Sequence, residues 1–246
     1  MGRIVLEIVA STVEDCIAAE SGGADRVELC TAIATGGLTP SLGTLVEAKK
    51  RVGIPIIVMV RQRPGGFCYS EEDFAVMRRD AGPFVEHRAD GIVFGVLHSD
   101  SSVDTNRCGK MLEIAGGKQT VFHRAFDVVP DANRALDELI DLGFTRVLTS
   151  GQKKTALEGR ERLRQLIVRA REQVEILPAG GVRPHNVRQL LEVTYCTQVH
   201  LTTFSARCDA SMSTSPVSFG SIPGAPSSWY ECVDREAVRC MREMLD

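Results

Sequence analysis

The sequence predicts an α/β fold, a single (β/α)8 TIM barrel with a closed parallel sheet. Apolar, β-rich runs alternate with amphipathic helical stretches from end to end of the chain. Strands that alternate with helices build βαβ units and hence a parallel sheet. The chain has 246 residues, which is a usual length for eight such units. Only 5% of the residues are aromatic, so the core depends on the aliphatic side chains that are typical of parallel sheets.

Eight apolar runs are expected to be the strands, at 4–10, 26–30, 54–61, 91–97, 120–126, 146–150, 174–178 and 198–202. The amphipathic stretches are expected to be helices, at 12–20, 41–52, 70–88, 104–115, 130–142, 156–172, 184–193 and 234–245. The residue types expected at helix N-termini are Ser11, Ser41, Ser70 and Asp131. An open doubly wound sheet is the alternative, but it usually has fewer strands and a G-x-G-x-x-G motif that does not follow the first strand here.

One segment, 207–230, departs from this alternation because it is rich in Ser, Pro and Gly. It lies between the last predicted strand and the last helix, at the face of a barrel where active sites form. Loops of this length usually have a role. We therefore expect a lid or an oligomer contact within a single domain that spans residues 1–246.

Composition excludes several classes of protein. The formal net charge is −3, which gives no basic footprint for a nucleic acid. No apolar stretch approaches the roughly 18 residues that cross a bilayer, and no secretory signal precedes the first strand. The eight cysteines form no C-x-x-C pair, so they are expected to be reduced thiols in the cytoplasm. Neither a nucleotide cofactor nor a zinc hydrolase motif is indicated.

Two glutamates stand at equivalent places in the first two predicted strands. Glu7 lies two residues before Val9, and Glu28 lies two residues before Cys30, so each pair shares a strand face. If both carboxylates point inward, they lie side by side, and at least one pKa rises unless a cation intervenes. Arg61, at the end of the third strand, is the natural cation. The arrangement predicts either a general acid–base pair or polar-ligand site, or a buried Glu–Arg network that fixes strand register without chemistry.

The motif FHRAFD at 122–127 brings three more polar groups to a strand end. Strand alternation places His123 and Asp127 on one side and Arg124 on the other, if the strand extends that far. A single strand histidine is more often a core residue, but its charged neighbours favour a functional role here. His200 in the last strand is a weaker case of the same kind. The candidate catalytic residues are therefore Glu7, Glu28, Arg61, His123, Arg124 and Asp127.

Two glycine-containing turns, at 149–151 and 179–181, follow the sixth and seventh predicted strands. Consecutive backbone N–H groups near a helix N-terminus bind phosphate or carboxylate. The candidate anion-binding residues are Arg63, Ser150, Gly151, Gly180 and Gly181.

Five motifs carry a resemblance to a known family. They are GADRVELC at 23–30, GGLTPS at 36–41, VRQRPGGFCYS at 60–70, FHRAFD at 122–127 and LTSGQ at 148–152. Their order and sequence closely resemble the CutC family of copper homeostasis proteins, over most of the chain. The resemblance implies a (β/α)8 barrel, a cytoplasmic location, homodimers or homotetramers, and copper handling.

The family resemblance also implies Cu(I) ligands, which would be thiols two residues after each strand glutamate. Cys30 is retained at the second of these positions, whereas Val9 stands at the first. Cu(I) prefers soft thiolate and thioether ligands. Further ligands on the same face of the barrel would be Cys68, Cys208 and Met212.

Three functions remain open from the sequence. The first is copper homeostasis through Cu(I) at the barrel mouth. The second is an isomerase, epimerase or hydrolase acting on a small anionic or phosphorylated metabolite, with Arg61 and Arg124 holding the anion and Glu28 or His123 moving a proton. The third is a non-catalytic oligomeric scaffold.

Overall fold

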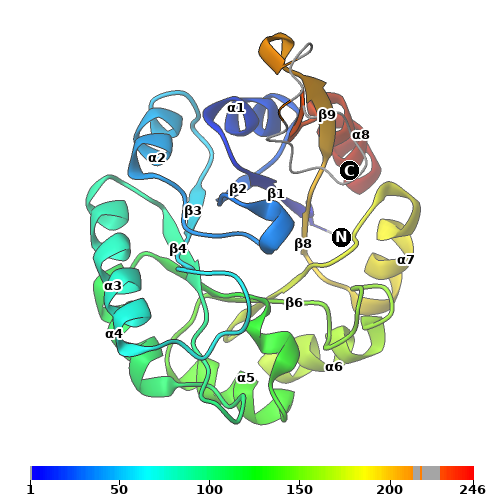
Figure 1. The fold of residues 1–246 in the computed structure, drawn as a ribbon. Coiled ribbons are helices and arrows are strands. Elements are labelled where there is room, and N and C mark those ends of the chain that lie inside the picture. Colours follow the sequence, from blue (N-terminus) through cyan, green and yellow to red (C-terminus); the bar gives the residue numbers. More distant parts are fainter. Residues whose placement is uncertain (1, 213–216, 218–227) are drawn as a thin grey trace.

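A computed structural model describes residues 2–212, 217 and 228–246 of the chain. Eight parallel strands form a nearly closed barrel, and Figure 1 shows them at the centre of a ring of helices. The fold class predicted from the alternation of strands and helices is confirmed.

The barrel strands are β1 (Val5–Ala10), β2 (Arg26–Leu29), β3 (Ile56–Met59), β4 (Gly91–Phe94), β5 (Gln119–Phe122), β6 (Arg146–Thr149), β7 (Glu175–Pro178) and β8 (Gln198–Leu201). The helices are α1 (Val13–Ser21), α2 (Leu42–Lys49), α3 (Glu71–Glu86), α4 (Thr105–Ala115), α5 (Ala132–Asp141), α6 (Arg160–Ala170), α7 (Pro184–Thr194) and α8 (Arg235–Leu245), with short 3-10 turns η1 (Ile33–Thr35), η2 (Arg124–Val128) and η3 (Ala210–Met212). Each predicted strand and helix overlaps one of these elements.

The strands follow one another around the barrel in the order β7-β6-β5-β4-β3-β2-β1-β8. A parallel ladder joins each neighbouring pair in that order, and no ladder joins β7 to β8 in the part of the chain that the structure describes. A side-chain hydrogen bond spans this seam instead, from Gln198 Nε2 to Glu175 Oε2 at 3.2 Å. Polar side chains inside the barrel therefore take part in closing it.

Helix starts follow the expected capping chemistry. The predicted N-caps that are confirmed are Ser41, Ser70 and Asp131. At the first helix the cap is Thr12 rather than Ser11, because Asp15 stands three residues after Thr12 and completes a capping box with it.

Strand alternation divides the core into two clusters of buried side chains. The outward-facing positions pack against the helices in a large apolar core. The inward-facing apolar positions form a small cluster inside the barrel, composed of Val9, Cys30, Ile57, Met59, Val93, Val121, Leu148, Leu177 and Ala179. Inward-facing positions at the N-terminal ends of several strands are polar instead, which places charged groups beneath this cluster.

Strands occupy both ends of the segment expected to be a long loop. β9 (Phe204–Cys208) pairs with β10 (Trp229–Val233) in an antiparallel sheet. The backbone N–H of Val233 donates to Asp15 Oδ1 at 2.7 Å, which attaches this sheet to α1. Residues 213–216 and 218–227 lie outside the described part of the chain, so the lid or oligomer contact stays a prediction. No helix in the described ranges is long and apolar enough to cross a membrane.

An added methyl group should have opposite effects on stability at two of the glycines. At Gly91, which begins β4, a Cβ atom would lie 2.4 Å from the carbonyl oxygen of Gln119 on β5. Gly91→Ala should therefore lower the free energy of unfolding by about 1–3 kcal/mol. At Gly109, inside α4, no atom outside the adjoining helix backbone lies within 4 Å of that position, so Gly109→Ala should raise the free energy of unfolding by roughly 0.5–1 kcal/mol. Urea unfolding compares the variants, and equal effects would contradict the described strand packing.

Candidate functional site

A cavity of about 450 Å³ opens at the C-terminal ends of the barrel strands. The candidate residues that line it are Glu28, Cys30, Arg61, His123, Arg124, Asp127, Gly180 and Gly181. The candidate residues that do not line it are Glu7, Arg63, Cys68, Ser150, Gly151, Cys208 and Met212. A larger, more open groove of about 810 Å³ lies between α5 and α6, away from the strand ends.

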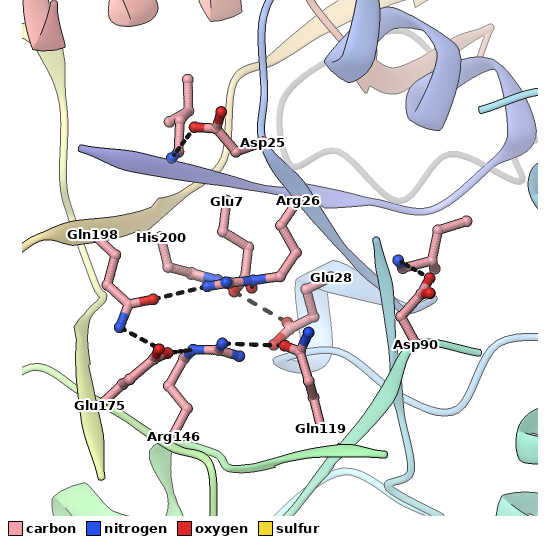
Figure 2. A network of polar contacts seen from close by, with 12 residues as sticks. Glu7, Asp25, Arg26, Glu28, Asp90, Gln119, Arg146, Glu175, Gln198 and His200 are labelled. Carbon is pink, nitrogen blue, oxygen red and sulfur yellow. Dashed lines mark hydrogen bonds and ion pairs between the residues drawn. The ribbon is translucent and has the colours of Figure 1, made fainter. Parts of the chain in front are cut away.

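Glu7 is the centre of a buried ion-pair network beneath the cavity, shown in Figure 2. Its Oε2 atom accepts from Arg26 Nε, and its Oε1 atom lies 2.7 Å from His200 Nδ1. The other ring nitrogen, His200 Nε2, lies 4.0 Å from Glu28 Oε1. Glu28 and His200 also line the cavity, so the network reaches from the barrel interior to the site.

The cation beside the two carboxylates is Arg26 rather than Arg61. Alternation puts Arg26 on the same inner face of β2 as Glu28, and the strand register pairs Arg26 with Glu7. The expectation that Arg61 intervenes between the carboxylates was therefore wrong.

The network continues across the barrel floor, as Figure 2 also shows. Arg26 Nη2 donates to Gln198 Oε1 at 2.9 Å, and Gln198 donates to Glu175. Arg146 Nε donates to Glu175 Oε2 at 2.7 Å, and Arg146 Nη2 donates to Gln119 Oε1 at 3.1 Å. Two arginines thus lie inside the barrel, and each is bonded to a carboxylate.

These contacts set the charges of Glu7 and His200. Burial alone would raise the pKa of Glu7, but Arg26 and His200 outweigh it and hold that pKa below its ordinary value. Burial alone would lower the pKa of His200, but Glu28 and Glu7 raise it above its ordinary value. The charged form of Glu7 therefore favours protonation of His200, and the protonated imidazole in turn favours the charged form of Glu7.

Glu28 differs from Glu7 because no arginine bonds to it in the described structure. Burial raises the pKa of Glu28 to about 7, an effect that His200 opposes and Glu7 reinforces. A carboxyl group with such a pKa exchanges protons near neutral pH, as a general acid or base must. Its neighbour Cys30 has a thiol pKa raised well above the ordinary range by burial and by Glu28.

Arg61 organises the loops at the rim of the cavity. Its Nη1 atom donates to the carbonyl oxygens of Thr35 at 3.1 Å and Gly37 at 2.8 Å, and its Nη2 atom donates to that of Gly65 at 2.8 Å. Its Nε atom makes no hydrogen bond to any residue that the structure describes, although Arg61 is only 5% exposed. Among the described residues Arg61 forms no ion pair, so it brings an uncompensated positive charge to the cavity.

His123 lies just after the end of β5 and presents a second unpartnered donor. Its Nδ1 atom accepts the backbone N–H of Ala125 at 3.2 Å, so the ring proton is on Nε2, which has no partner. Burial, together with Arg61, lowers the pKa of His123 to about 3, so the ring is neutral. A Cβ atom at Gly95 would lie 2.6 Å from this ring, so glycine there makes room for it.

Arg124 and Asp127 lie on the same side, in contrast to the alternation that was expected. The fifth strand ends at Phe122 and the chain enters the turn η2, which brings Asp127 Oδ2 within 2.7 Å of Arg124 Nε. The Asp127 carboxylate also accepts the backbone N–H groups of Ser150 and Gln152, at 3.0 and 3.2 Å. It therefore occupies the turn that Ser150 and Gly151 were expected to offer to an external anion.

The second predicted anion turn remains open. Gly180 and Gly181 have φ values of +91° and +70°, a conformation that suits glycine, and both line the cavity beside Arg183. Arg63 lies outside the cavity, where its Nε atom donates to Asp73 at 2.7 Å.

The soft ligands are arranged differently from the predicted set. A Cβ atom at Gly37 would lie 3.3 Å from Cys30 Sγ and 3.6 Å from Met59 Cε. The Cys30 thiol and the end of the Met59 side chain therefore both face Gly37 in the cavity wall. Cys68 and Cys208 are exposed thiols outside that cavity. Met212, in η3, is also outside its lining.

One group of metal-ligand types is found among the described residues, formed by Glu7, Glu28 and His200. Carboxylate and imidazole donors suit harder metals than Cu(I). Both oxygens of Glu7 already have partners, so this group serves a proton network better than a copper ion.

Sequence reasoning missed Arg26, Met59, Arg146, Arg183 and Gln198. Arg26 was detectable, because it lies two residues before Glu28 and therefore shares its strand face. The shared position of Cys30 and Met59 beside Gly37 depends on neighbouring strands and on the glycine turn, so strand spacing alone could not reveal it.

Replacing each network glutamate by glutamine should reveal opposite linkages to pH. Glu7 has a lowered pKa, so its charge stabilises the fold above its ordinary value of 4.5 and loses this effect as the pH falls. Glu7→Gln should lower the free energy of unfolding by about 3 kcal/mol at pH 7, and by less at pH 4 and below. Glu28 has a raised pKa, so wild-type stability falls between pH 4.5 and about 7. As the pH increases from 5 to 8, the free energy of unfolding of Glu28→Gln should therefore rise relative to that of wild type by on the order of 2 kcal/mol.

Urea unfolding of the three proteins across this pH range makes the comparison. A Glu28→Gln effect that is the same at pH 5 and pH 8 would contradict the assigned pKa of Glu28.

Comparison with known proteins agrees with the motifs. The sequence model of the CutC family matches residues 4–205. A CutC family protein from Treponema denticola is 45% identical over 216 residues, 88% of each chain. The human copper homeostasis protein cutC homolog is 41% identical over 203 residues, which cover 82% of this chain and 74% of the relative.

Solved structures agree as well. A CutC protein from Streptococcus agalactiae has a TM-score of 0.77 and 34% identity, covering 80% of this chain and 97% of that chain. Phosphoribosylanthranilate isomerase from Thermotoga maritima, at 13% identity and a TM-score of 0.56 over 98% of both chains, shares the fold alone. The resemblance carried by the five motifs is confirmed: the chain belongs to the CutC family.

Proposed function

We propose that the cavity binds a small anionic metabolite and that Glu28 transfers a proton to or from it. The observation that carries this proposal is the position of Glu28, a carboxyl group with a pKa of about 7 in the cavity wall. Titratable groups with pKa values near the working pH are typical of general acids and bases.

The charge of the cavity supports an anionic ligand. Arg61, Arg124 and Arg183 all line it. Arg124 is paired with Asp127, whereas Arg61 and Arg183 form no ion pair with the described residues. Guanidinium groups hold carboxylates and phosphates through two hydrogen bonds at once, so the excess of arginine favours such ligands.

The network beneath the cavity supports proton transfer in particular. Glu7 binds His200 Nδ1 and leaves His200 Nε2 facing Glu28. When Glu28 loses its proton, the nearby imidazole compensates the negative charge, so the carboxylate is not an isolated buried charge. The neutral His123 ring has a free Nε2–H group, which would donate to a ligand oxygen. Isomerisation, epimerisation and hydrolysis are all consistent with these roles.

Glu28→Gln should abolish proton exchange between solvent and ligand, because the amide cannot take up a proton at neutral pH. The measurement is ¹H NMR in D₂O of a set of small phosphorylated and carboxylated metabolites, each incubated with the protein. Loss of a C–H signal with wild type that is slowed at least about 100-fold in Glu28→Gln would support the proposal.

The matched control is Glu113→Gln, which changes an exposed glutamate on α4 outside the cavity and should leave exchange unchanged. Equal exchange rates in wild type and Glu28→Gln would exclude Glu28 as the proton-transfer group.

We propose as a second function that the cavity takes Cu(I) as cargo. The names of relatives that refer to copper homeostasis support it, and so does the position of the Cys30 and Met59 side chains, which both face Gly37 in the cavity wall. Thiolate and thioether sulfur are the donors that Cu(I) prefers. The Glu7, Glu28 and His200 group fits Cu(I) less well, because two of its donors are carboxylates.

Cu(I) affinity should rise by about tenfold per pH unit, since the metal must displace the proton of a Cys30 thiol with a raised pKa. An anaerobic competition titration against a chromogenic chelator between pH 6 and pH 8 measures this dependence. Cys30→Ser should abolish tight binding and Met59→Leu should weaken it, while Cys240→Ser, at an exposed thiol, should have no effect. Binding that Cys30→Ser leaves unchanged would end the copper proposal for this cavity.

We further propose a cytoplasmic location and a homo-oligomer of two or four chains, as the family resemblance implies. The exposed free thiols of Cys68, Cys208 and Cys240 support a reducing compartment. Analytical ultracentrifugation determines the number of chains.

A further inference from the structure

We propose that the turn formed by Gly180, Gly181 and Val182 is a phosphate subsite, and that the ligand of the cavity is a phosphate monoester of a small hydroxy compound. This inference rests on the proposed metabolite-binding function and names its ligand class. The turn joins β7 to the start of α7, and both glycines line the cavity.

The backbone of this turn presents three successive donors. The N–H groups of Gly180, Gly181 and Val182 donate to no acceptor among the described residues. The carbonyl oxygen of Gly180 accepts from Ala156 N at 2.8 Å, and that of Gly181 accepts from Asn186 Nδ2 at 2.8 Å. Because a trans peptide directs its N–H opposite to its C=O, the next two N–H groups point away from Ala156 and Asn186.

Positive charge surrounds these donors. A Cβ atom at Gly180 would lie 3.1 Å from Arg124 Nη1, an atom that makes no hydrogen bond within the described structure. Arg183 follows the turn, and among the described residues its guanidinium donates hydrogen bonds to two backbone carbonyl oxygens, those of Val182 at 2.8 Å and Thr202 at 3.4 Å. Successive amides at a helix start together with two guanidinium groups match the three oxygens of a phosphate dianion.

The turn one strand earlier shows what such a backbone binds in this protein. After β6, the N–H groups of Ser150 and Gln152 both donate to the carboxylate of Asp127. That turn is therefore filled by an oxyanion from the chain itself. The turn after β7 has the equivalent position in the barrel, and no carboxylate in the described part of the chain accepts its N–H groups.

Two buried donors elsewhere in the cavity point independently to a ligand rich in oxygen. His123 is 3% exposed and Arg61 is 5% exposed, and His123 Nε2 and Arg61 Nε have no hydrogen-bond partner among the described residues. Buried donors without partners are costly. Hydroxyl or carbonyl oxygens of a ligand whose phosphate sits on the turn would satisfy them.

Isothermal titration of the full chain tests the subsite with inorganic phosphate, ribose 5-phosphate and ribose as probes. At pH 6 we expect saturable binding of phosphate, tighter binding of ribose 5-phosphate, and no binding of ribose. Arg183→Ala should weaken the binding of inorganic phosphate and of ribose 5-phosphate by about tenfold each. Arg183 is exposed and forms no ion pair with the described residues, so this variant should fold. The matched control is Arg188→Ala, which removes one positive charge from the exposed face of α7 outside the cavity.

No saturable phosphate binding, or equal losses in Arg183→Ala and Arg188→Ala, would overturn the subsite. If ribose 5-phosphate binds no more tightly than inorganic phosphate, the proposal that the ligand is a phosphate monoester is wrong. Proton exchange, measured on the same wild-type protein, separates this inference from the proposed reaction. Phosphate binding without proton exchange would reject the reaction alone, and proton exchange without phosphate binding would reject the subsite alone.

Discussion

The buried ion pair between Glu7 and Arg26 is the constraint on which the site depends. A carboxylate inside a barrel is costly unless a cation and further hydrogen bonds compensate it, and here Arg26 and His200 do so. The pair fixes the register of β1 against β2 and orients the imidazole of His200. Since Arg26 bonds to Glu7, Glu28 has no arginine partner among the described residues, and burial raises the pKa of Glu28 to about 7.

The two carboxylates thus have separate roles that follow from their neighbours. Glu7 is a permanent charge that positions His200, and Glu28 is the group whose charge changes near neutral pH. A comparable division is seen among the turns, since Asp127 fills the one after β6 whereas the one after β7 keeps free amides. In both cases an internal partner of opposite charge makes one position structural, Arg26 for Glu7 and Asp127 for the turn after β6. The equivalent position without such a partner is available to a ligand.

Periodicity was sufficient to predict the barrel, because alternation of apolar residues reports which strand face is buried. It also placed Glu28 and Cys30 correctly on one inner face. It failed for Arg124 and Asp127, since the strand ends at Phe122 and a 3-10 turn has a different periodicity. The partner of Glu7 was missed for another reason: an arginine at a strand start resembles a solvent-exposed residue until the register places it inside.

The missing ladder between β7 and β8 determines where the barrel is easiest to open. Separating any other neighbouring strands breaks backbone hydrogen bonds, whereas here Gln198 and Glu175 are joined by a side-chain bond. Local fluctuations should concentrate at this seam. The turn after β7 and the residues after β8 both line the cavity, so opening the seam would widen the entrance to the cavity while the paired strands that carry Glu28 and Arg61 stay fixed.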